Sequence, residues 1–327
     1  MTASGLKVSV VVPTFWRPDQ IARCLTALQR QDLPPDEFEI IVADDAASRE
    51  CERLVTAFAS QSRPGPTIRY VPVHDAHGPA AARNLGWRAA GAEIVAFTDD
   101  DCVPSPSWLR HGLQAMKDGA DGVWGAVRVP IPPNPTDYER EVSRLEDAEF
   151  ATANCFFRRS AIAEIGGFDE RYTAAWREDS DLWFSLLEHG KRLVHAPDAL
   201  VVHPVRPAPW GISLRLQRLS QFNALLYKKH PVLYRARVQS APPIRYYSIL
   251  ASALGFVGGL LTRRHPVAAA AAALWILLTG QFCAERLRAT SRHPSHVAEI
   301  LVTSSLIPLV SIFWRVRGAF RFRVVFL

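Results

Sequence analysis

Hydrophobic positions in the first 120 residues fall into short apolar runs and longer segments with apolar side chains at helical spacing. The apolar runs are KVSVVVPTF, FEIIVADDAAS, IRYVPV and EIVAFTDDD. Each has the length and composition of a buried strand. Between the first two runs, Ile21, Cys24, Leu25 and Leu28 are spaced to lie on one face of a helix. Strands that alternate with helices predict an α/β fold with a mostly parallel sheet and helices on both of its faces.

Residues 121–205 have a less regular pattern. We expect strands in DGVWGAVRV and EFATANCFFRR, a helix in EDSDLWFSLLEHG, and two short strands in RLVHAPDALVVHPV. Residues 211–230 have the pattern of an amphipathic basic helix.

The end of the chain contains three long apolar stretches bracketed by arginines, at 247–261, 267–283 and 297–314. A membrane span needs about 20 residues, so each stretch is short or marginal. Three full spans would leave the arginine-rich C-terminus outside, which the positive-inside rule disfavours. Two spans, or one hairpin with an interfacial helix, fit the pattern better. A soluble helical core domain is the alternative, but stretches this free of charge favour a membrane-associated region.

Charge and cysteine usage narrow the class of partner. The net charge is +6 and the sequence pI is about 9.2. Nine arginines follow residue 260, against only Glu285 and Glu299, which favours an anionic membrane surface and argues against nucleic acid. The five cysteines are scattered and form no CxxC pair, which indicates a reducing compartment and no structural zinc site. The early run VSVVV is too short for a signal peptide, so we expect no secretory signal.

Polar residues follow three of the predicted strands. Pro13 and Thr14 end the first run, Asp44–Asp45 end the second, and Asp99–Asp101 end the fourth. Ligands of parallel α/β sheets bind beyond the carboxyl ends of the strands, so these residues are expected to face one crevice.

The three consecutive carboxylates at 99–101 repel one another unless a cation neutralises them. Mg²⁺ or Mn²⁺ would do so with few protein oxygens and would leave coordination positions for phosphate. The alternative is an N-cap for a helix at 106–117, but capping needs one acid rather than three.

Two other features leave both interpretations open. The acids at 44–45 could bond a nucleobase N–H or a ribose hydroxyl, or could form an Asx turn. Arg83, beside Asn84 in an alanine-rich helix, could meet diphosphate oxygens or could be an ordinary surface arginine.

Five segments, in this order, resemble the family-2 glycosyltransferases, which have the Rossmann-like GT-A fold. They are VSVVVPTFWRPDQIARCLTAL, EIIVADDAAS, GPAAARNLGWRAAGAEIVAFTDDDCVP, ANCFFRRSAIAEIGGFDE and WREDSDLWFSLLEHG. Their order and spacing match over residues 7 to about 205. The resemblance implies an inverting transfer of a sugar from a nucleotide-diphosphate sugar to an acceptor hydroxyl.

The resemblance also implies roles on the donor side. Pro13 and Thr14 would line the nucleoside pocket, Asp45 would contact the base, and Arg83 would lie near the nucleotide.

The metal would be held by the triple acid and a later histidine. Asp99 would approach the ribose and the metal, Asp100 would belong to the nucleotide-sugar site, and Asp101 would be the principal ligand that bridges Mn²⁺ or Mg²⁺ to the diphosphate. His203 stands where some relatives have a further ligand, with His195 as the fallback.

On the acceptor side, Asp179 matches the family's general base. It opens a predicted helix whose dipole would keep the carboxylate ionised; an acidic first turn that only complements the dipole is the alternative. Glu178 would contact the acceptor or support the site, and Asn154 would do one or the other. Trp176 could stack on a sugar or simply pack.

The QxxRW element of the processive members is missing from LRLQRLSQFNALLY. Its absence favours an enzyme that adds a single sugar or builds a short chain on a lipid-linked or cell-envelope acceptor at the cytoplasmic face of the membrane. We therefore expect a catalytic domain at 1–210, with a nucleotide-sugar half at 1–101 and an acceptor half at 102–210. A basic linker at 211–245 and a membrane-associated region at 246–327 would follow. A nucleotidyltransferase with the same metal site, or a membrane-tethered binding protein on an inactive scaffold, are the alternatives.

Overall fold

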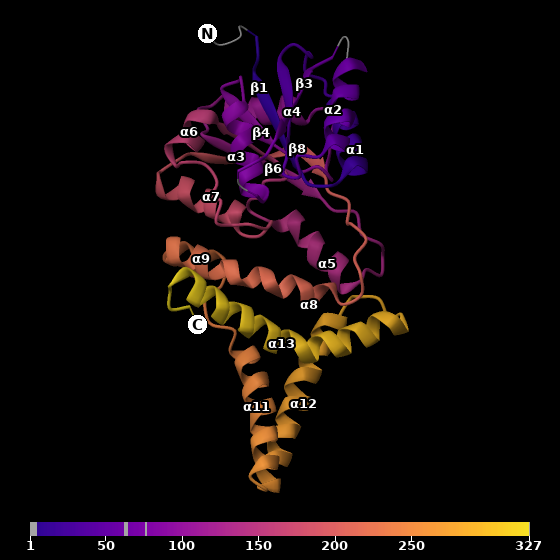
Figure 1. Cartoon of the computed structure of the whole chain (residues 1–327), viewed down its shortest axis with the longest axis vertical. Coiled ribbons are helices and arrows are strands. Elements are labelled where there is room, and N and C mark those ends of the chain that lie inside the picture. Colours follow the sequence, from indigo (N-terminus) through magenta and orange to yellow (C-terminus); the bar gives the residue numbers. More distant parts are fainter. Residues whose placement is uncertain (1–4, 62–64, 76, 327) are drawn as a thin grey trace. The chain divides into compact units, whose positions relative to one another are not determined.

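A computed structural model describes residues 5–61, 65–75 and 77–326 (Figure 1). The chain divides into two compact units. The first comprises Met1–Pro130 and Ser143–Val205, and the second comprises Ile131–Val142 and Arg206–Leu327. Residues 131–142, which the sequence pattern assigned to the catalytic domain, thus group with the C-terminal unit.

The first unit is built on an eight-stranded sheet in the order β3-β2-β1-β4-β7-β6-β8-β5. Its N-terminal half consists of the four predicted parallel strands: β1 (Val8–Thr14), β2 (Phe38–Asp44), β3 (Thr67–Pro72) and β4 (Ile94–Phe97). Because these strands run the same way, their carboxyl ends meet at one edge. The α/β fold with a mostly parallel first half is therefore as predicted.

The other half of the sheet is mixed. β7 (Cys155–Arg158) pairs antiparallel with β4 on one side and with β6 (Gly122–Arg128) on the other. β8 (Leu193–Val202) pairs parallel with β6, and the short β5 (Val103–Pro104) pairs antiparallel with β8. The strand predicted at 149–159 is thus confined to its last residues.

The two short strands predicted within 192–205 form the single strand β8. Its pairing with β6 shifts register between Gly125 and Ala126, opposite Pro197. Because proline has no N–H to donate, the ladder is interrupted there, which explains why the sequence pattern broke in two.

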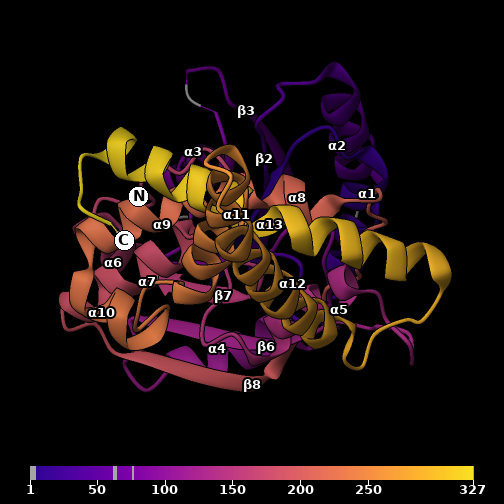
Figure 2. The ribbon, with the colours of Figure 1, turned by 90° about the horizontal axis from the view of Figure 1, so that it is seen from below.

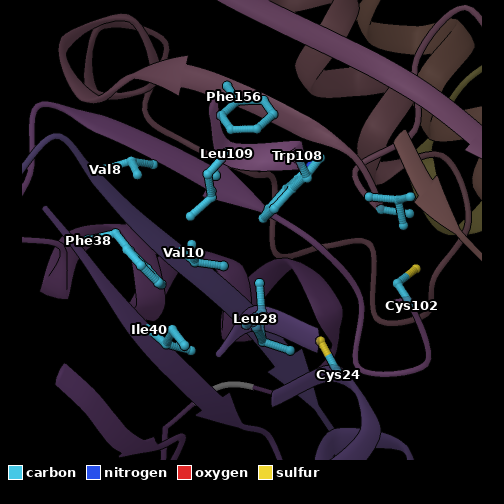
Figure 3. Packing of buried hydrophobic residues seen from close by; sticks show 14 of the residues in the cluster. Val8, Val10, Cys24, Leu28, Phe38, Ile40, Cys102, Trp108, Leu109 and Phe156 are labelled. Carbon is cyan, nitrogen blue, oxygen red and sulfur yellow. The ribbon is translucent and has the colours of Figure 1, made fainter. Parts of the chain in front are cut away.

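Helices cover both faces of the sheet, as predicted. These helices are α1 (Pro18–Leu28), α2 (Arg49–Gln61), α3 (Pro79–Ala89), α4 (Trp108–Met116), α6 (Arg159–Glu164) and α7 (Glu178–Glu188). The main core lies where Val10 of β1 and Ile40 of β2 pack with Leu28 of α1 and Trp108 of α4 (Figure 3).

On the opposite face, α3 approaches β1 closely. A Cβ at Gly86 would lie 2.3 Å from Val11 Cγ1, so only glycine permits this distance. Successive side chains of a strand point to opposite faces of the sheet. Val10 therefore packs in the main core, and Val11 packs against α3, the helix that carries Arg83.

The second unit is helical. It contains α5 (Asp137–Ser143), α8 (Ile212–Leu216), α9 (Gln221–Lys229), α10 (Pro231–Arg237), α11 (Ile244–Leu261), α12 (His265–Leu287) and α13 (Pro294–Phe322). A 3₁₀ turn at Gln217–Ser220 joins α8 to α9, so the single amphipathic helix predicted at 211–230 is two helices. α11, α12 and α13 have 18, 23 and 29 residues, and each is long and apolar enough to cross a membrane.

Candidate active site

The end of β1 and the triple acid are tied together by hydrogen bonds. Thr14 Oγ1 donates to Asp100 at 2.7 Å, and Arg17 Nη1 donates to the same carboxylate at 3.0 Å. Asp100 is buried, which raises the pKa of its carboxyl, while Arg17 acts in the opposite direction. The structure therefore brings together Thr14 and Asp100, two residues predicted for the nucleotide-sugar site, and Pro13 is buried beside them. Arg17 also belongs to this group, although the sequence pattern did not predict it.

The two acids at the end of β2, Asp44 and Asp45, have different surroundings. Asp44 accepts hydrogen bonds from the backbone N–H groups of Ala46 and Ser48, so the Asx turn belongs to Asp44. Asp45 accepts from Gly78 N at 2.9 Å and lies 3.2 Å from His77 Nδ1. This carboxylate thus fixes the entry to α3, and its contact with a nucleobase stays a prediction.

Arg83 is an internal connector rather than a surface residue. Its side chain is 3% exposed; Nη2 donates to Asp99 at 2.8 Å and Nη1 donates to Glu178 at 3.0 Å. One guanidinium on α3 thus joins the loop after β4 to the first turn of α7. Both terminal nitrogens of Arg83 bind carboxylates, so Arg83 is not an exposed ligand for a diphosphate. Its expected position near the nucleotide stays a prediction.

Arg83 and the nearby carboxylates each stabilise the charged form of the other. Burial alone would lower the pKa of Arg83, but Asp99, Glu178 and Asp179 raise it above its ordinary value. Burial would raise the pKa of Asp99, and Arg83 holds it below its usual range. The predicted base Asp179 therefore shares one electrostatic cluster with Asp99 and Arg83.

Asp179 stands in the first turn of α7, as predicted. Its Oδ1 accepts a hydrogen bond from Ser180 N at 2.6 Å. Arg177, the residue immediately before α7, has a φ of 76°. This angle belongs to the left-handed conformation, which residues other than glycine rarely adopt. Backbone strain of this kind is concentrated at functional sites, and here it sets the direction in which α7 starts.

The predicted metal ligands Asp101 and His203 lie side by side, and Cys102 joins them. One ligand atom from each of the three residues lies within 4.8 Å of the others, and Asp101 Oδ1 is 3.6 Å from His203 Nε2. The pairing of Val103 with Val202 explains the proximity, because it brings the residues next to β5 and β8 together.

This group fits a divalent cation. The separation of 3.6 Å is too long for a strong hydrogen bond, but two atoms bound to one Mg²⁺ at about 2.1 Å each lie roughly 3 to 4 Å apart. His203 Nδ1 is buried and has no hydrogen-bond partner in the described part of the chain. Burial and the neighbouring Asp99 and Asp101 raise the pKa of the Cys102 thiol well above its ordinary value. Mg²⁺ and Mn²⁺ bind oxygen and nitrogen in preference to sulfur, so Asp101 and His203 are the better ligands of the three.

The cluster has an excess of negative charge. It contains the carboxylates of Asp99, Asp100, Asp101, Glu178 and Asp179. In the described part of the chain, the guanidinium groups of Arg17 and Arg83 form ion pairs with Asp100, Asp99 and Glu178. A divalent cation would offset part of the remaining charge.

The remaining predicted residues are more peripheral. Asn154 is completely buried; its Oδ1 accepts from Trp108 Nε1 and its Nδ2 donates to the carbonyls of Ala126 and Ala199, which favours the supporting role over acceptor binding. Trp176 is 38% exposed and stacks 4.8 Å from the Arg177 guanidinium, so it is not a core residue.

The fallback ligand His195 lies outside the metal group. It is exposed near the start of β8, where its ring stacks on Trp124 at 5.2 Å. His203, after the other end of β8, is the histidine that the structure brings to Asp101.

The buried carboxyl of Glu178 should make the free energy of unfolding of the protein depend on pH. Burial raises the pKa of its carboxyl from 4.5 to about 7, with Asp179 adding to the effect and Arg83 opposing it. A group that binds its proton more tightly in the folded state contributes stability below pH 4.5 that is lost as the pH rises through about 7. This contribution is on the order of 3 kcal/mol.

We expect Glu178→Gln to flatten the pH dependence of the melting temperature between pH 5 and 8, measured with EDTA present so that no cation alters the site. The exposed Glu164→Gln serves as the control and should follow the wild type. A parallel curve for Glu178→Gln and wild type would contradict the assignment.

Sequence profiles place the chain in a known enzyme class. The profile of glycosyl transferase family 2 matches residues 9–174, and that of glycosyl transferase family group 2 matches residues 136–284. The chain belongs to glycosyl transferase family 2 and is a glycosyltransferase.

Its curated relatives are distant and mostly longer. Glycosyltransferase AglE from Haloferax volcanii is 26% identical over 219 residues, which cover 63% of this chain and 70% of AglE. Validoxylamine A glucosyltransferase from Streptomyces hygroscopicus subsp. limoneus is 27% identical over 69% of this chain and 57% of its own length. Pre-mycofactocin glycosyltransferase from Mycobacterium tuberculosis is 30% identical over 61% of this chain, which spans less than half (43%) of that relative.

Solved structures establish the fold. Mannosyltransferase PcManGT from Pyrobaculum calidifontis, determined with GDP-Man and Mn2+, superposes with a TM-score of 0.62 at 20% identity and covers 96% of this chain and 88% of its own. A TarS fragment from S. aureus in complex with UDP-GlcNAc has a TM-score of 0.52 at 17% identity and covers 98% and 93%. The GT-A fold expected from the sequence is thereby confirmed.

Proposed function

We propose that the protein is an inverting, metal-dependent glycosyltransferase that moves a sugar from a nucleotide-diphosphate sugar to a hydroxyl of a lipid-linked or cell-envelope acceptor. The observation that carries this proposal is the bridge from Asp99 through Arg83 to Glu178. It supports a donor site after β4 and a general base at the start of α7 that face each other across one guanidinium.

The reaction requires one bond to break and one to form on opposite faces of the sugar. The bond between the anomeric carbon and the diphosphate oxygen breaks, the acceptor oxygen bonds to the same carbon, and the hydroxyl proton passes to Asp179. A carboxylate in this position provides general base catalysis. Arg83 orients Asp99 and Glu178 on the two sides of this axis, so donor and acceptor are held in line.

Asp101 and His203 would hold a Mn²⁺ or Mg²⁺ ion. The ion would stabilise the negative charge that the nucleoside diphosphate acquires as it leaves. Asp99 would take part through the carboxylate edge that Arg83 does not occupy. Thr14 and Arg17 hold Asp100 in place beside this group, and Pro13, Thr14 and Asp45 would border the nucleoside.

The acceptor is expected at a membrane. Three long apolar helices in the second unit suggest membrane association. The excess of arginine in the same region supports a catalytic unit that faces the cytoplasm. Family membership sets aside the nucleotidyltransferase alternative, and turnover of a donor would exclude an inactive binding protein.

A donor panel tests the proposal. The purified full-length protein in detergent is incubated with GDP-mannose, UDP-N-acetylglucosamine and other nucleotide sugars, and the release of nucleoside diphosphate is measured with Mn²⁺, with Mg²⁺ or with EDTA. We expect one nucleotide class to be turned over with metal and at least about 100-fold less with EDTA, because loss of charge stabilisation of the leaving group costs several kcal/mol. Absence of turnover for every donor in the presence of a polyprenyl phosphate acceptor would contradict it.

A further inference from the structure

α11 and α12 form an antiparallel hairpin (Figure 1). At its base the rings of Tyr246 and Phe282 lie 5.5 Å apart, and towards its tip Gly259 contacts Ala268. A Cβ at Gly259 would lie 2.7 Å from Ala268 N, so the two helix backbones approach through small residues. Close packing through glycine and alanine is typical of helices in lipid.

The outer surface of the hairpin is apolar and exposed. Leu254, Leu261 and Ile276 have 63%, 80% and 63% of their surfaces accessible. At 1.5 Å per residue, helices of 18 and 23 residues are roughly 27 and 35 Å long, which matches a hydrocarbon core of about 30 Å. The hairpin therefore has the length and the surface to cross a bilayer.

α13 is long and apolar like α11 and α12, but it runs in a different direction from them. It runs across the base of the hairpin, not along it, in both views (Figures 1 and 2). Arg286, in the last turn of α12, donates through Nη1 to Thr303 and Ser304, near the middle of α13. The centre of α13 is thus fixed at the level where the hairpin ends, which is incompatible with a third span beside α12.

Further contacts hold α13 along a charged stretch of the same unit. Glu299 accepts from Gly211 N at 2.7 Å, and Phe322 O accepts from Lys228 Nζ at 2.8 Å. Between them, Gly318 lies against the backbone of Gln221. One face of α13 therefore follows residues 211–228, which carry Arg215, Arg218 and Lys228, over most of its length.

The opposite face of α13 is apolar and exposed. This face includes Leu301, Leu309, Phe313 and Phe320. A helix with charged neighbours on one side and exposed apolar residues on the other is suited to the interface of a bilayer, with its apolar face buried about 5 to 10 Å deep.

We propose that a bilayer with anionic headgroups covers these surfaces, that only α11 and α12 cross it, and that α13 lies in its cytoplasmic interface. This topology develops the membrane association given under the proposed function. Charge agrees with it, because only Arg263 and Arg264 lie at the tip, whereas the base side carries Arg315, Arg317 and the other basic residues of α8 to α13.

Single-cysteine labelling tests the topology. The five native cysteines are buried, so the wild type supplies the background for a membrane-impermeant maleimide. Exposed positions are replaced in the full chain: Ser60→Cys in α2 as the cytoplasmic reference, Thr262→Cys at the hairpin tip, and Val325→Cys after α13. Each variant is labelled in inverted and in right-side-out vesicles from expressing cells.

We expect Ser60→Cys and Val325→Cys to react only in inverted vesicles and Thr262→Cys only in right-side-out vesicles. Reaction of Val325→Cys from the same side as Thr262→Cys would establish three spans and overturn the proposal. Reaction of Thr262→Cys from the same side as Ser60→Cys would show that the hairpin does not cross the bilayer. If the protein instead remained in the soluble fraction as a dimer, a second copy of the chain, and not lipid, would cover the apolar surfaces.

A spin label at Leu309→Cys gives a second readout. An in-plane α13 places the label within about 10 Å of the headgroups, and a spanning α13 places it near the bilayer centre. Both measurements are independent of sugar transfer, so their failure can be distinguished from failure of the donor panel.

Discussion

Replacement of Asp179 by asparagine is expected to lower the rate of sugar transfer by about 10²- to 10⁴-fold, the usual contribution of general base catalysis. Asparagine keeps the shape of the side chain and the oxygen that accepts from Ser180 N, so α7 should still begin at the same residue. Because the donor site depends on Asp99 and Asp101, the dissociation constant of the nucleotide sugar should change less than about threefold.

The measurement is kcat from nucleoside diphosphate release, with donor affinity from calorimetry. Asp181→Asn is the matched control, since Asp181 belongs to the same first turn but is buried with its carboxylate 3.2 Å from the Tyr172 hydroxyl. It should lower the melting temperature and leave the kcat of the folded protein close to wild type. Unchanged turnover in Asp179→Asn would remove this residue from the role of base.

Replacement of Asp101 by alanine is expected to abolish the part of donor binding that depends on a cation. Asp101 supplies the carboxylate of the group that it forms with His203 and Cys102. Loss of a residue that merely supports a metal ligand costs about 10- to 100-fold in affinity, so loss of the carboxylate ligand itself should cost more.

Calorimetric titration of Mn²⁺ and of a nucleoside diphosphate into each variant provides the measurement. His203→Gln should also weaken Mn²⁺ binding by more than about 10- to 100-fold, because His203 is itself one of the proposed ligands. Cys102→Ala should bind Mn²⁺ as the wild type does, because Mn²⁺ prefers oxygen and nitrogen ligands to sulfur. Wild-type affinity in Asp101→Ala would refute the assignment of the site.

The local pattern of the sequence predicted much of the first unit. Apolar runs followed by acids identified the strands whose carboxyl ends meet, and the buried residues Ile21, Cys24, Leu25 and Leu28 are those of the predicted helix face. The start of α7, with Glu178 and Asp179 in its first turn, was also predicted. These features depend on neighbours in sequence, which periodicity reports directly.

Contacts between distant segments could not be obtained in this way. Arg83 and Glu178 are 95 positions apart, and their ion pair depends on the packing of α3 and α7 in the folded unit. Cys102 reaches His203 only through the antiparallel pairing of Val103 with Val202. The direction of α13 likewise depends on the contacts of Arg286, which hydropathy does not contain.

The ion pairs of Arg83 also limit how this unit can move. Separation of the loop after β4 from the start of α7 would leave a buried charge without its partner, at a cost of about 3 to 5 kcal/mol. Separation of these two segments is therefore energetically disfavoured. Rearrangement of the surface loop that presents the exposed Phe15 and Trp16 would give substrates access without breaking the ion pairs of Arg83.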